Sequence, residues 1–288
     1  MQTVLILGAD GFIGKSLFAY LSARSKGQFS LTGTRFYFND PALDFLDMRI
    51  KQDVASYFEK TRPDFVILLS GTKDVKQCET DFTYAQTLNT QPVLDIIDII
   101  ERRRLETRVL YFSSDYVFDG ARGFYAPHDQ PNPGTRYGQS KLLSETALLN
   151  SVIDFKIIRT SAVMGQGANF FDWLVHALRH EKEINLFNNV YFTPTPQCFL
   201  NEIMYEVLLQ YSAIQNPILH LVGEERLTRY ELACFIKECI PDGPARIRGE
   251  EADLTHSTFQ KDLSMLQSEF VRTFQTADFY TYLKRELS

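Results

Sequence analysis

Short runs of apolar residues alternate with amphipathic stretches through the first half of the chain. The runs that predict strands lie at residues 3–7, 29–34, 64–70, 107–113 and 155–160. Between them, apolar residues at helical spacing predict helices over 12–25, 81–104 and 138–149. Steady alternation of strand and helix favours βαβ units with right-handed crossovers. We therefore expect an α/β fold, a Rossmann-type doubly wound parallel sheet with helices on both faces.

The second half of the chain is less regular. The pattern predicts a helix over 170–180, a strand over 217–223 and a helix that begins at Thr228, where Glu231 completes a capping box. We interpret residues 1–160 as an NAD(P)-binding Rossmann domain. Residues 161–288 would form a smaller, mainly substrate-binding α/β portion, with some segments returning to the sheet.

Composition narrows the class of protein. Hydrophobic residues make up 44% of the 288 residues and the net charge is −6, which is typical of a globular protein and not of a nucleic-acid partner. The N-terminus does not resemble a signal peptide, and no apolar run approaches the length of a membrane span. The four cysteines form no C-x-x-C pair, so we expect a reduced cytoplasmic protein without a metal site.

The first predicted strand runs into the sequence GADGFIG, in which the glycines have the spacing G-x-x-G-x-x-G. Glycines at a strand-to-helix turn let the backbone approach a pyrophosphate, which the helix N-terminus then holds. The strand before this loop and the helix after it favour dinucleotide binding over a merely tight turn. The residues expected at the cofactor here are Gly8, Gly11, Phe12, Ile13 and Gly14.

Arg35 stands near the end of the second predicted strand, in the sequence LTGTRF. An acidic residue at this place would bind the ribose hydroxyls of NAD, whereas arginine suits the 2′-phosphate of NADP. The sequence therefore favours NADP(H), with NAD(H) as the alternative. The plainer interpretation of Arg35 is a surface residue on a loop.

Hydroxyl, phenol and amine side chains follow the fourth predicted strand. Ser114 comes at its end, and Tyr137 and Lys141 are four residues apart, on one face of a helix. A lysine ammonium near a phenol lowers the pKa of the phenol, and a serine hydroxyl can hold a carbonyl oxygen against it. Such a set delivers a proton to a carbonyl whose carbon receives hydride from a nicotinamide.

Three segments, GADGFIG, YFSSDYVFDG and YGQSK, resemble the extended short-chain dehydrogenase/reductases. Within them, the chain is most similar to the dTDP-4-dehydrorhamnose reductase group, which has S-T-D-Y-V-F-D-G where this chain has S-S-D-Y-V-F-D-G. The similarity runs over nearly the whole chain. It implies an NADP(H)-dependent reductase of a 4-keto nucleotide-sugar, in polysaccharide biosynthesis, with a homodimer as a further family expectation.

The resemblance also implies roles for the matching residues. Ser114 would orient the carbonyl, Tyr137 would donate the proton, and Lys141 would lower the pKa of Tyr137 and bind the nicotinamide ribose. Asn89 would support the lysine through water. Further cofactor contacts would come from Asp44, Phe45, Ser70 and Gly71. The residues expected at the sugar are Asp115, Tyr116, Ser161 and Asn169.

The chain departs from the group in segments that face the substrate. Ala162-Val163-Met164-Gly165 stands where the group has Trp-Val-Tyr-Gly, so we expect the redox chemistry to be kept while the sugar differs. Two alternatives stay open. One is a nucleotide-sugar epimerase or dehydratase of the same superfamily, although Asp115 is not followed by a second acidic residue, as it is in the dehydratases. The other is a non-catalytic, cofactor-binding regulatory subunit of another enzyme.

Overall fold

The computed structural model describes residues 1–25, 27–37, 40–255 and 258–288, which divide into two compact units. Unit 1 comprises residues 1–117, 131–158 and 215–219. Unit 2 comprises residues 118–130, 159–214 and 220–288. Segments from both halves of the sequence therefore contribute to each unit.

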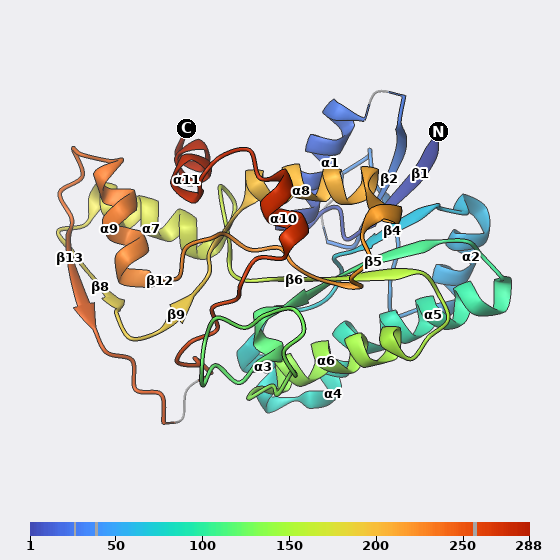
Figure 1. Cartoon of the computed structure of the whole chain (residues 1–288), viewed down its shortest axis with the longest axis horizontal. Coiled ribbons are helices and arrows are strands. Elements are labelled where there is room, and N and C mark those ends of the chain that lie inside the picture. Colours follow the sequence, from blue (N-terminus) through green and yellow to red (C-terminus); the bar gives the residue numbers. More distant parts are fainter. Residues whose placement is uncertain (26, 38–39, 256–257) are drawn as a thin grey trace. The chain divides into compact units, whose positions relative to one another are not determined.

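A seven-stranded sheet has the order β11-β6-β5-β4-β1-β2-β3 (Figure 1). Its strands are β1 (Gln2–Leu7), β2 (Phe29–Arg35), β3 (Asp44–Phe45), β4 (Phe65–Leu68), β5 (Arg108–Ser114), β6 (Phe155–Thr160) and β11 (Ile218–His220). The pairs β1–β2, β1–β4, β4–β5 and β2–β3 are parallel. The predicted doubly wound parallel sheet is confirmed, and the strand order reverses at β1.

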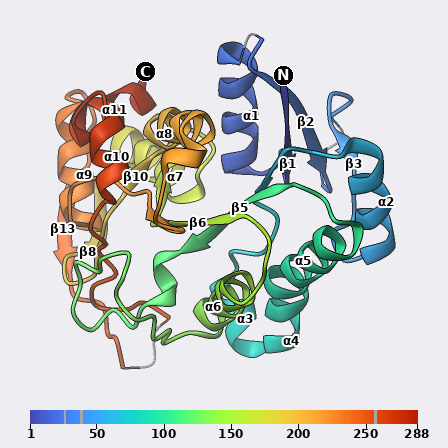
Figure 2. The same cartoon turned by 45° about the vertical axis from the view of Figure 1, so that its right-hand side comes forward.

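Helices cover both faces of this sheet because its inner strands are apolar on both sides. On one face, Val54 of α2 and Ile96 of α5 pack in one core cluster with Leu5 of β1 and Val66 of β4. The helix α1 lies across the sheet from α2, α5 and α6 (Figure 2). The helices of unit 1 are α1 (Phe12–Arg24), α2 (Lys51–Thr61), α3 (Val75–Thr80), α4 (Phe82–Ala85), α5 (Gln91–Arg103) and α6 (Arg136–Leu149).

The helix that the sequence predicts over 81–104 is confirmed, with one π-helical turn inside it. Between α4 and α5 lies a π-helical turn, η1 (Gln86–Thr90), and Pro92 stands in the first turn of α5. Proline lacks a backbone N–H and is tolerated only in the first turn of a helix. Helical backbone therefore runs without a break from Phe82 to Arg103, and π-helical turns of this kind often lie at functional sites.

Unit 2 contains short strands and separate helices. Its strands are β7 (Val163–Met164), β8 (Glu183–Phe187), β9 (Tyr191–Phe192), β10 (Thr195–Pro196), β12 (Leu227–Thr228) and β13 (Arg246–Glu250). Its helices are α7 (Asn169–His180), α8 (Gln197–Leu209), α9 (Arg229–Glu238), α10 (Glu269–Phe274) and α11 (Phe279–Leu287). The described residues also form the 3₁₀ turns η2 (Asp115–Val117) in unit 1 and η3 (Tyr211–Ala213) in unit 2. The predicted capping box is confirmed, because Glu231 N donates to Thr228 Oγ1 (3.1 Å) and Thr228 N to Glu231 Oε2 (2.7 Å).

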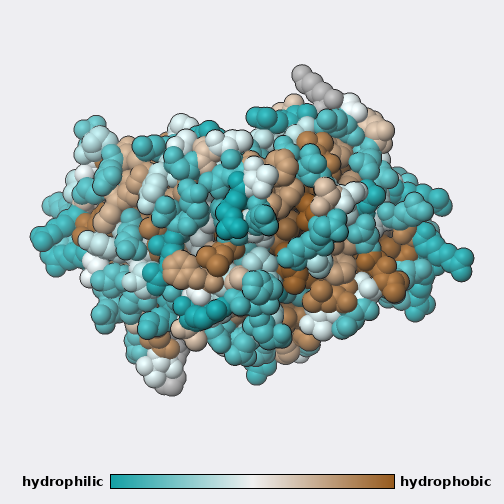
Figure 3. Space-filling view, viewed as in Figure 1, coloured by the Kyte–Doolittle hydropathy of each residue, from teal (hydrophilic) through white to brown (hydrophobic). Residues whose placement is uncertain are grey.

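The surface in view in Figure 3 carries hydrophilic side chains with hydrophobic ones among them. Some large apolar side chains are exposed, and they come from separate elements, such as Leu94 of α5 and Trp173 of α7. None of the helices in the described ranges has the length and apolar composition that crossing a bilayer requires.

Candidate active site

The glycine loop joins β1 to α1, and its backbone leaves no room for a side chain at Gly8 or Gly14. Gly8 has φ +86°, in the left-handed region that favours glycine. A Cβ on Gly14 would lie 2.1 Å from the carbonyl oxygen of Gly8. Gly11 is the N-cap of α1 and offers no capping side chain to the helix that starts with Phe12 and Ile13. The close backbone turn and the uncapped helix N-terminus therefore fit a pyrophosphate.

The adjoining ends of β2 and β3 bring three predicted cofactor residues together. Arg35 is the register partner of Phe45, and its guanidinium carbon lies 5.9 Å from the centre of the Phe45 ring. Arg35 Nε donates to the carbonyl oxygen of Leu43 (3.2 Å). Asp44 and Phe45 are both exposed, and the Asp44 carboxylate accepts a hydrogen bond from the Tyr57 hydroxyl (2.8 Å).

The loop after β4 lies between the glycine loop and η1. A Cβ on Gly8 would lie 3.0 Å from Ser70 N, and a Cβ on Gly71 would lie 2.6 Å from Asn89 Oδ1. The same amide oxygen of Asn89 accepts from Thr72 N (2.8 Å). Ser70, Gly71 and Asn89 thus form one connected group beside the glycine loop.

Ser114, Asp115 and Tyr116 meet Tyr137 where β5 ends. The Ser114 hydroxyl donates to Asp115 Oδ1 (2.9 Å) and accepts from Tyr116 N (3.3 Å). The rings of Tyr116 and Tyr137 are in edge-to-face contact, with centroids 5.6 Å apart. Asp115 is buried, and its carboxylate accepts the hydrogen bond of the Ser114 hydroxyl within unit 1.

Lys141 is buried on the face of α6 that turns toward β5. Its ammonium donates to the carbonyl oxygen of Phe112 (2.7 Å) and lies 4.6 Å from the centre of the Tyr111 ring. Burial lowers the pKa of Lys141 to about 8, and the Glu145 carboxylate opposes this shift. Lys141 is therefore a cation at neutral pH that loses its proton in mildly alkaline solution.

The pKa of Tyr137 is raised, not lowered as the sequence predicts. Burial is the largest cause, the nearby Asp115 carboxylate adds to it, and a hydrogen bond with the Ser114 hydroxyl opposes it. The Lys141 ammonium, expected to lower this pKa, instead hydrogen-bonds the Phe112 carbonyl. The phenol is consequently protonated at neutral pH.

Asn89 is hydrogen-bonded to α6 through contacts that the sequence does not predict. Its side-chain Nδ2 donates to Ser140 Oγ (3.0 Å), and its backbone carbonyl oxygen accepts from Ser144 Oγ (2.9 Å). The sequence analysis did not single out these two serines. The signal that could have found them is the hydroxyl spacing within YGQSKLLSE, where both serines share the buried side of α6 with Lys141.

The two remaining predicted residues belong to unit 2. Ser161 is buried directly after β6, and its carbonyl oxygen accepts from Thr160 Oγ1 (3.3 Å). Asn169 is the exposed first residue of α7. Their expected contact with a sugar stays a prediction.

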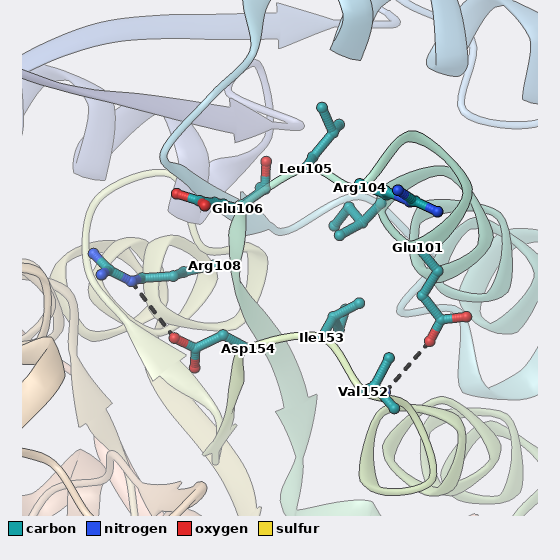
Figure 4. Close-up of a pocket in the computed structure, with 10 residues that line it drawn as sticks. Glu101, Arg104, Leu105, Glu106, Arg108, Val152, Ile153 and Asp154 are labelled. Atoms are coloured by element: carbon teal, nitrogen blue, oxygen red, sulfur yellow. Dashed lines mark hydrogen bonds and ion pairs between the residues drawn. The ribbon is translucent and has the colours of Figure 1, made fainter.

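A pocket in unit 1 lies at the amino ends of β5 and β6, away from the residues described above. It lies beside the first residue of β5 and the residue before β6 (Figure 4). Its polar rim includes an ion pair between Arg108 and Asp154 (3.5 Å) and a hydrogen bond from Val152 N to Glu101 (3.3 Å). None of the residues lining it is a predicted site residue. In open α/β sheets, ligands bind at the carboxyl ends of the strands, so we do not assign the active site here.

Sheets of this order bind dinucleotides at the carboxyl end of the strand where the order reverses. In this chain, that strand leads into the glycine loop, and the Ser114, Tyr137 and Lys141 group stands on β5 and α6 of the same unit. This combination of sheet order, glycine loop and side chains is that of a protein with an extended short-chain dehydrogenase/reductase-like fold.

The chain belongs to the RmlD substrate binding domain family, whose model matches residues 1–276. The dTDP-4-dehydrorhamnose reductase of Aggregatibacter actinomycetemcomitans is 27% identical over 243 residues, which cover 82% of this chain and 78% of that protein. A solved structure of a hypothetical dTDP-4-dehydrorhamnose reductase from Sulfolobus tokodaii has a TM-score of 0.84 at 30% identity, over 97% of this chain and 96% of that one. The dTDP-4-dehydrorhamnose reductase of Bacillus anthracis, solved in complex with NADP, has the same fold, with a TM-score of 0.85 at 21% identity over 100% and 99% of the two chains.

Proposed function

We propose that this chain is an NADP(H)-dependent reductase of a 4-keto nucleotide-sugar. The observation that carries the proposal is the group of Ser114, Tyr137 and Lys141, in the same unit as a loop in which Gly8 and Gly14 leave no room for a side chain. Family membership and relatives named dTDP-4-dehydrorhamnose reductase support the same reaction class.

The cofactor would be held by the glycine loop and by the ends of β2 and β3. The crowding at Gly14 and the uncapped start of α1 suit the pyrophosphate. Arg35 suits a 2′-phosphate, so NADP(H) is favoured and NAD(H) is the alternative. Asp44 and Phe45 would border the adenine from the neighbouring strand.

When bound, NADP(H) supplies a hydride to the carbonyl carbon of the substrate. The Ser114 hydroxyl would donate a hydrogen bond to the carbonyl oxygen, and Tyr137 would transfer its proton to that oxygen. The phenol carries the proton that this role requires, because burial raises the pKa of Tyr137 and keeps it protonated at neutral pH. Lys141, charged below about pH 8, would bind the ribose of the nicotinamide.

The sugar would contact Asp115 and Tyr116, and Ser161 and Asn169 stay predicted sugar contacts. Of Asp115 and Tyr116, Tyr116 is the better supported sugar contact, because its ring packs against Tyr137 and is partly exposed. Simple reduction is favoured over epimerisation or dehydration by the Asp115-Tyr116 sequence. One NADPH consumed for each sugar reduced would distinguish it from a reaction that recycles its cofactor.

Replacing the proton donor tests the proposal. In Tyr137→Phe, turnover of a 4-keto nucleotide-sugar should fall at least about 100-fold, the usual contribution of a general acid, while the Kd for NADPH is kept. Tyr20→Phe, on the far part of α1, serves as the control and should retain wild-type turnover. Full activity of Tyr137→Phe would refute the assigned donor. A wild-type chain that binds NADPH but reduces no sugar in a broad panel would favour the regulatory-subunit alternative.

A further inference from the structure

Asp10 of the glycine loop reaches the end of β2. Its Oδ2 accepts hydrogen bonds from two consecutive backbone N–H groups, those of Phe36 and Tyr37, both at 2.9 Å. Both donors come directly after Arg35, the last residue of β2. Successive N–H groups that converge on one point make an anion-binding concavity. In this chain, a carboxylate from another segment fills that concavity.

The loop that carries Asp10 is fastened to β2 along its length. Ala9 N donates to the carbonyl oxygen of Thr34 (2.8 Å), and Gly8 N donates to the Thr34 hydroxyl (3.2 Å). A Cβ on Gly33 would lie 2.7 Å from the Cβ of Ala9, so the two segments are in close contact. The carboxylate of Asp10 is therefore held at the end of β2 and cannot move aside freely.

Two cations lie around the same turn. The Arg35 guanidinium contacts the Leu43 carbonyl and the Phe45 ring, and no carboxylate within the described ranges pairs with it. The Arg49 guanidinium lies 4.9 Å from the centre of the Phe36 ring, but its charge is paired with Asp47 (2.7 Å). Arg35 is thus a cation without a carboxylate partner among the described residues, and the Asp10 carboxylate is bound to the two residues that follow Arg35.

We propose that Asp10 is a specificity-determining residue that weakens the binding of a 2′-phosphate at the end of β2. The inference rests on the proposed dinucleotide function and goes beyond it. A phosphate dianion beside Arg35 would be attracted by that guanidinium. It would also be repelled by the Asp10 carboxylate and would compete with it for the N–H groups of Phe36 and Tyr37. The preference between NADP(H) and NAD(H) is then the balance of two opposed charges.

Asp10→Asn tests the inference, because asparagine keeps the acceptor oxygen and the shape while it removes the charge. The Kd for NADPH should fall about tenfold, the size expected for removing one like charge several ångström from a phosphate near a protein surface. The Kd for NADH, which lacks the phosphate, should change less than about twofold on the same argument. Arg35→Gln removes the cation that attracts the phosphate, so it should raise the Kd for NADPH relative to the Kd for NADH.

The measurement is equilibrium binding of NADPH and NADH to the full chain, by fluorescence or calorimetry, at low and high salt. The gain in Asp10→Asn should shrink at high salt, because ions screen exposed charges. The matched control is Asp64→Asn, which also removes a carboxylate that accepts a backbone N–H, that of Thr3 (2.7 Å), at the other end of β1. It should leave the ratio of the two Kd values unchanged.

The outcomes separate this inference from the proposed function. An unchanged ratio in Asp10→Asn, or equal weakening of both cofactors, would overturn the inference and leave Asp10 as a residue that only holds the turn. A wild-type chain that binds neither NADPH nor NADH would refute the dinucleotide function itself. If Asp10→Asn does not fold, Asp10→Ser keeps a short acceptor without charge and carries the same expectation.

Discussion

At the scale of single residues, burial decides the charge states of the two central side chains. Tyr137 is half-buried and Lys141 is buried, and burial disfavours the charged form of each. The phenol therefore keeps its proton, while the amine releases its proton more readily than a lysine in water. At neutral pH the structure accordingly holds a neutral acid and a cation, the starting state that proton transfer to a carbonyl requires.

Lys141 should make the stability of the protein depend on alkaline pH. Its pKa is about 8 in the folded chain and about 10.4 when unfolded, so between these values the unfolded state binds more protons. The free energy of unfolding of the wild type should consequently rise relative to Lys141→Met as the pH increases from 8 to about 10. The rise should be on the order of 2–3 kcal/mol, measured by urea unfolding across that range. A constant difference would show that the pKa of Lys141 is not lowered.

At the scale of elements, the placement of α6 against the 3₁₀ turn η2 holds Tyr137 beside Ser114. Gly138 makes this contact possible, because a Cβ at its position would lie 2.0 Å from the carbonyl oxygen of Tyr116 and 2.9 Å from Pro133. The helix also begins with a capping hydrogen bond from Gly138 N to Thr135 Oγ1 (3.0 Å). One glycine thus controls how closely the proton donor approaches the end of β5.

Gly138→Ala should push α6 away from η2. We expect a loss of about 2–3 kcal/mol in the free energy of unfolding, the usual cost of overpacking, together with reduced turnover. Gln139→Ala, on the exposed side of the same helix, should stay within about 0.5 kcal/mol of the wild type. Urea unfolding of the three proteins measures both effects. Equal stability of the two variants would show that α6 can shift at no cost.

At the scale of the whole molecule, a buried histidine of unit 2 should make the free energy of unfolding depend on acidic pH. His220 is fully buried, and its Nε2 lies 3.3 Å from Arg159 Nη1, with Arg159 itself buried. Burial and, next, the neighbouring guanidinium lower the pKa of His220 to about 3. The unfolded chain would take up this proton near pH 6.5, whereas the folded chain would not.

Stability should therefore fall as the pH decreases from about 6.5 toward 3, and His220 should contribute at most about 1.4 kcal/mol per pH unit to the slope. His220→Gln should reduce this slope, whatever its effect on stability at neutral pH. The exposed His176→Gln is the control and should keep the wild-type slope. Chemical denaturation at several pH values gives the slopes, and parallel slopes for His220→Gln and the wild type would contradict the assignment.

Local patterns in the sequence encode part of the fold and part of the site. The apolar run of β1, the glycines after it and the helical spacing after them predict a strand, a tight loop and α1, because each depends on neighbouring residues only. The spacing of Tyr137 and Lys141 likewise placed both on one side of α6. The parallel order of the sheet followed from the alternation of strands and helices.

The contacts between distant groups depend on the tertiary structure. Asp10 with the turn after β2, Asn89 with Ser140, and the Lys141 ammonium with the Phe112 carbonyl are contacts between elements far apart in sequence. No local pattern encodes them, because they depend on how strands pair and helices pack. The same holds for the pKa of Tyr137: spacing alone suggests a nearby cation, but the degree of burial, which is a property of the assembled fold, determines the direction of the shift.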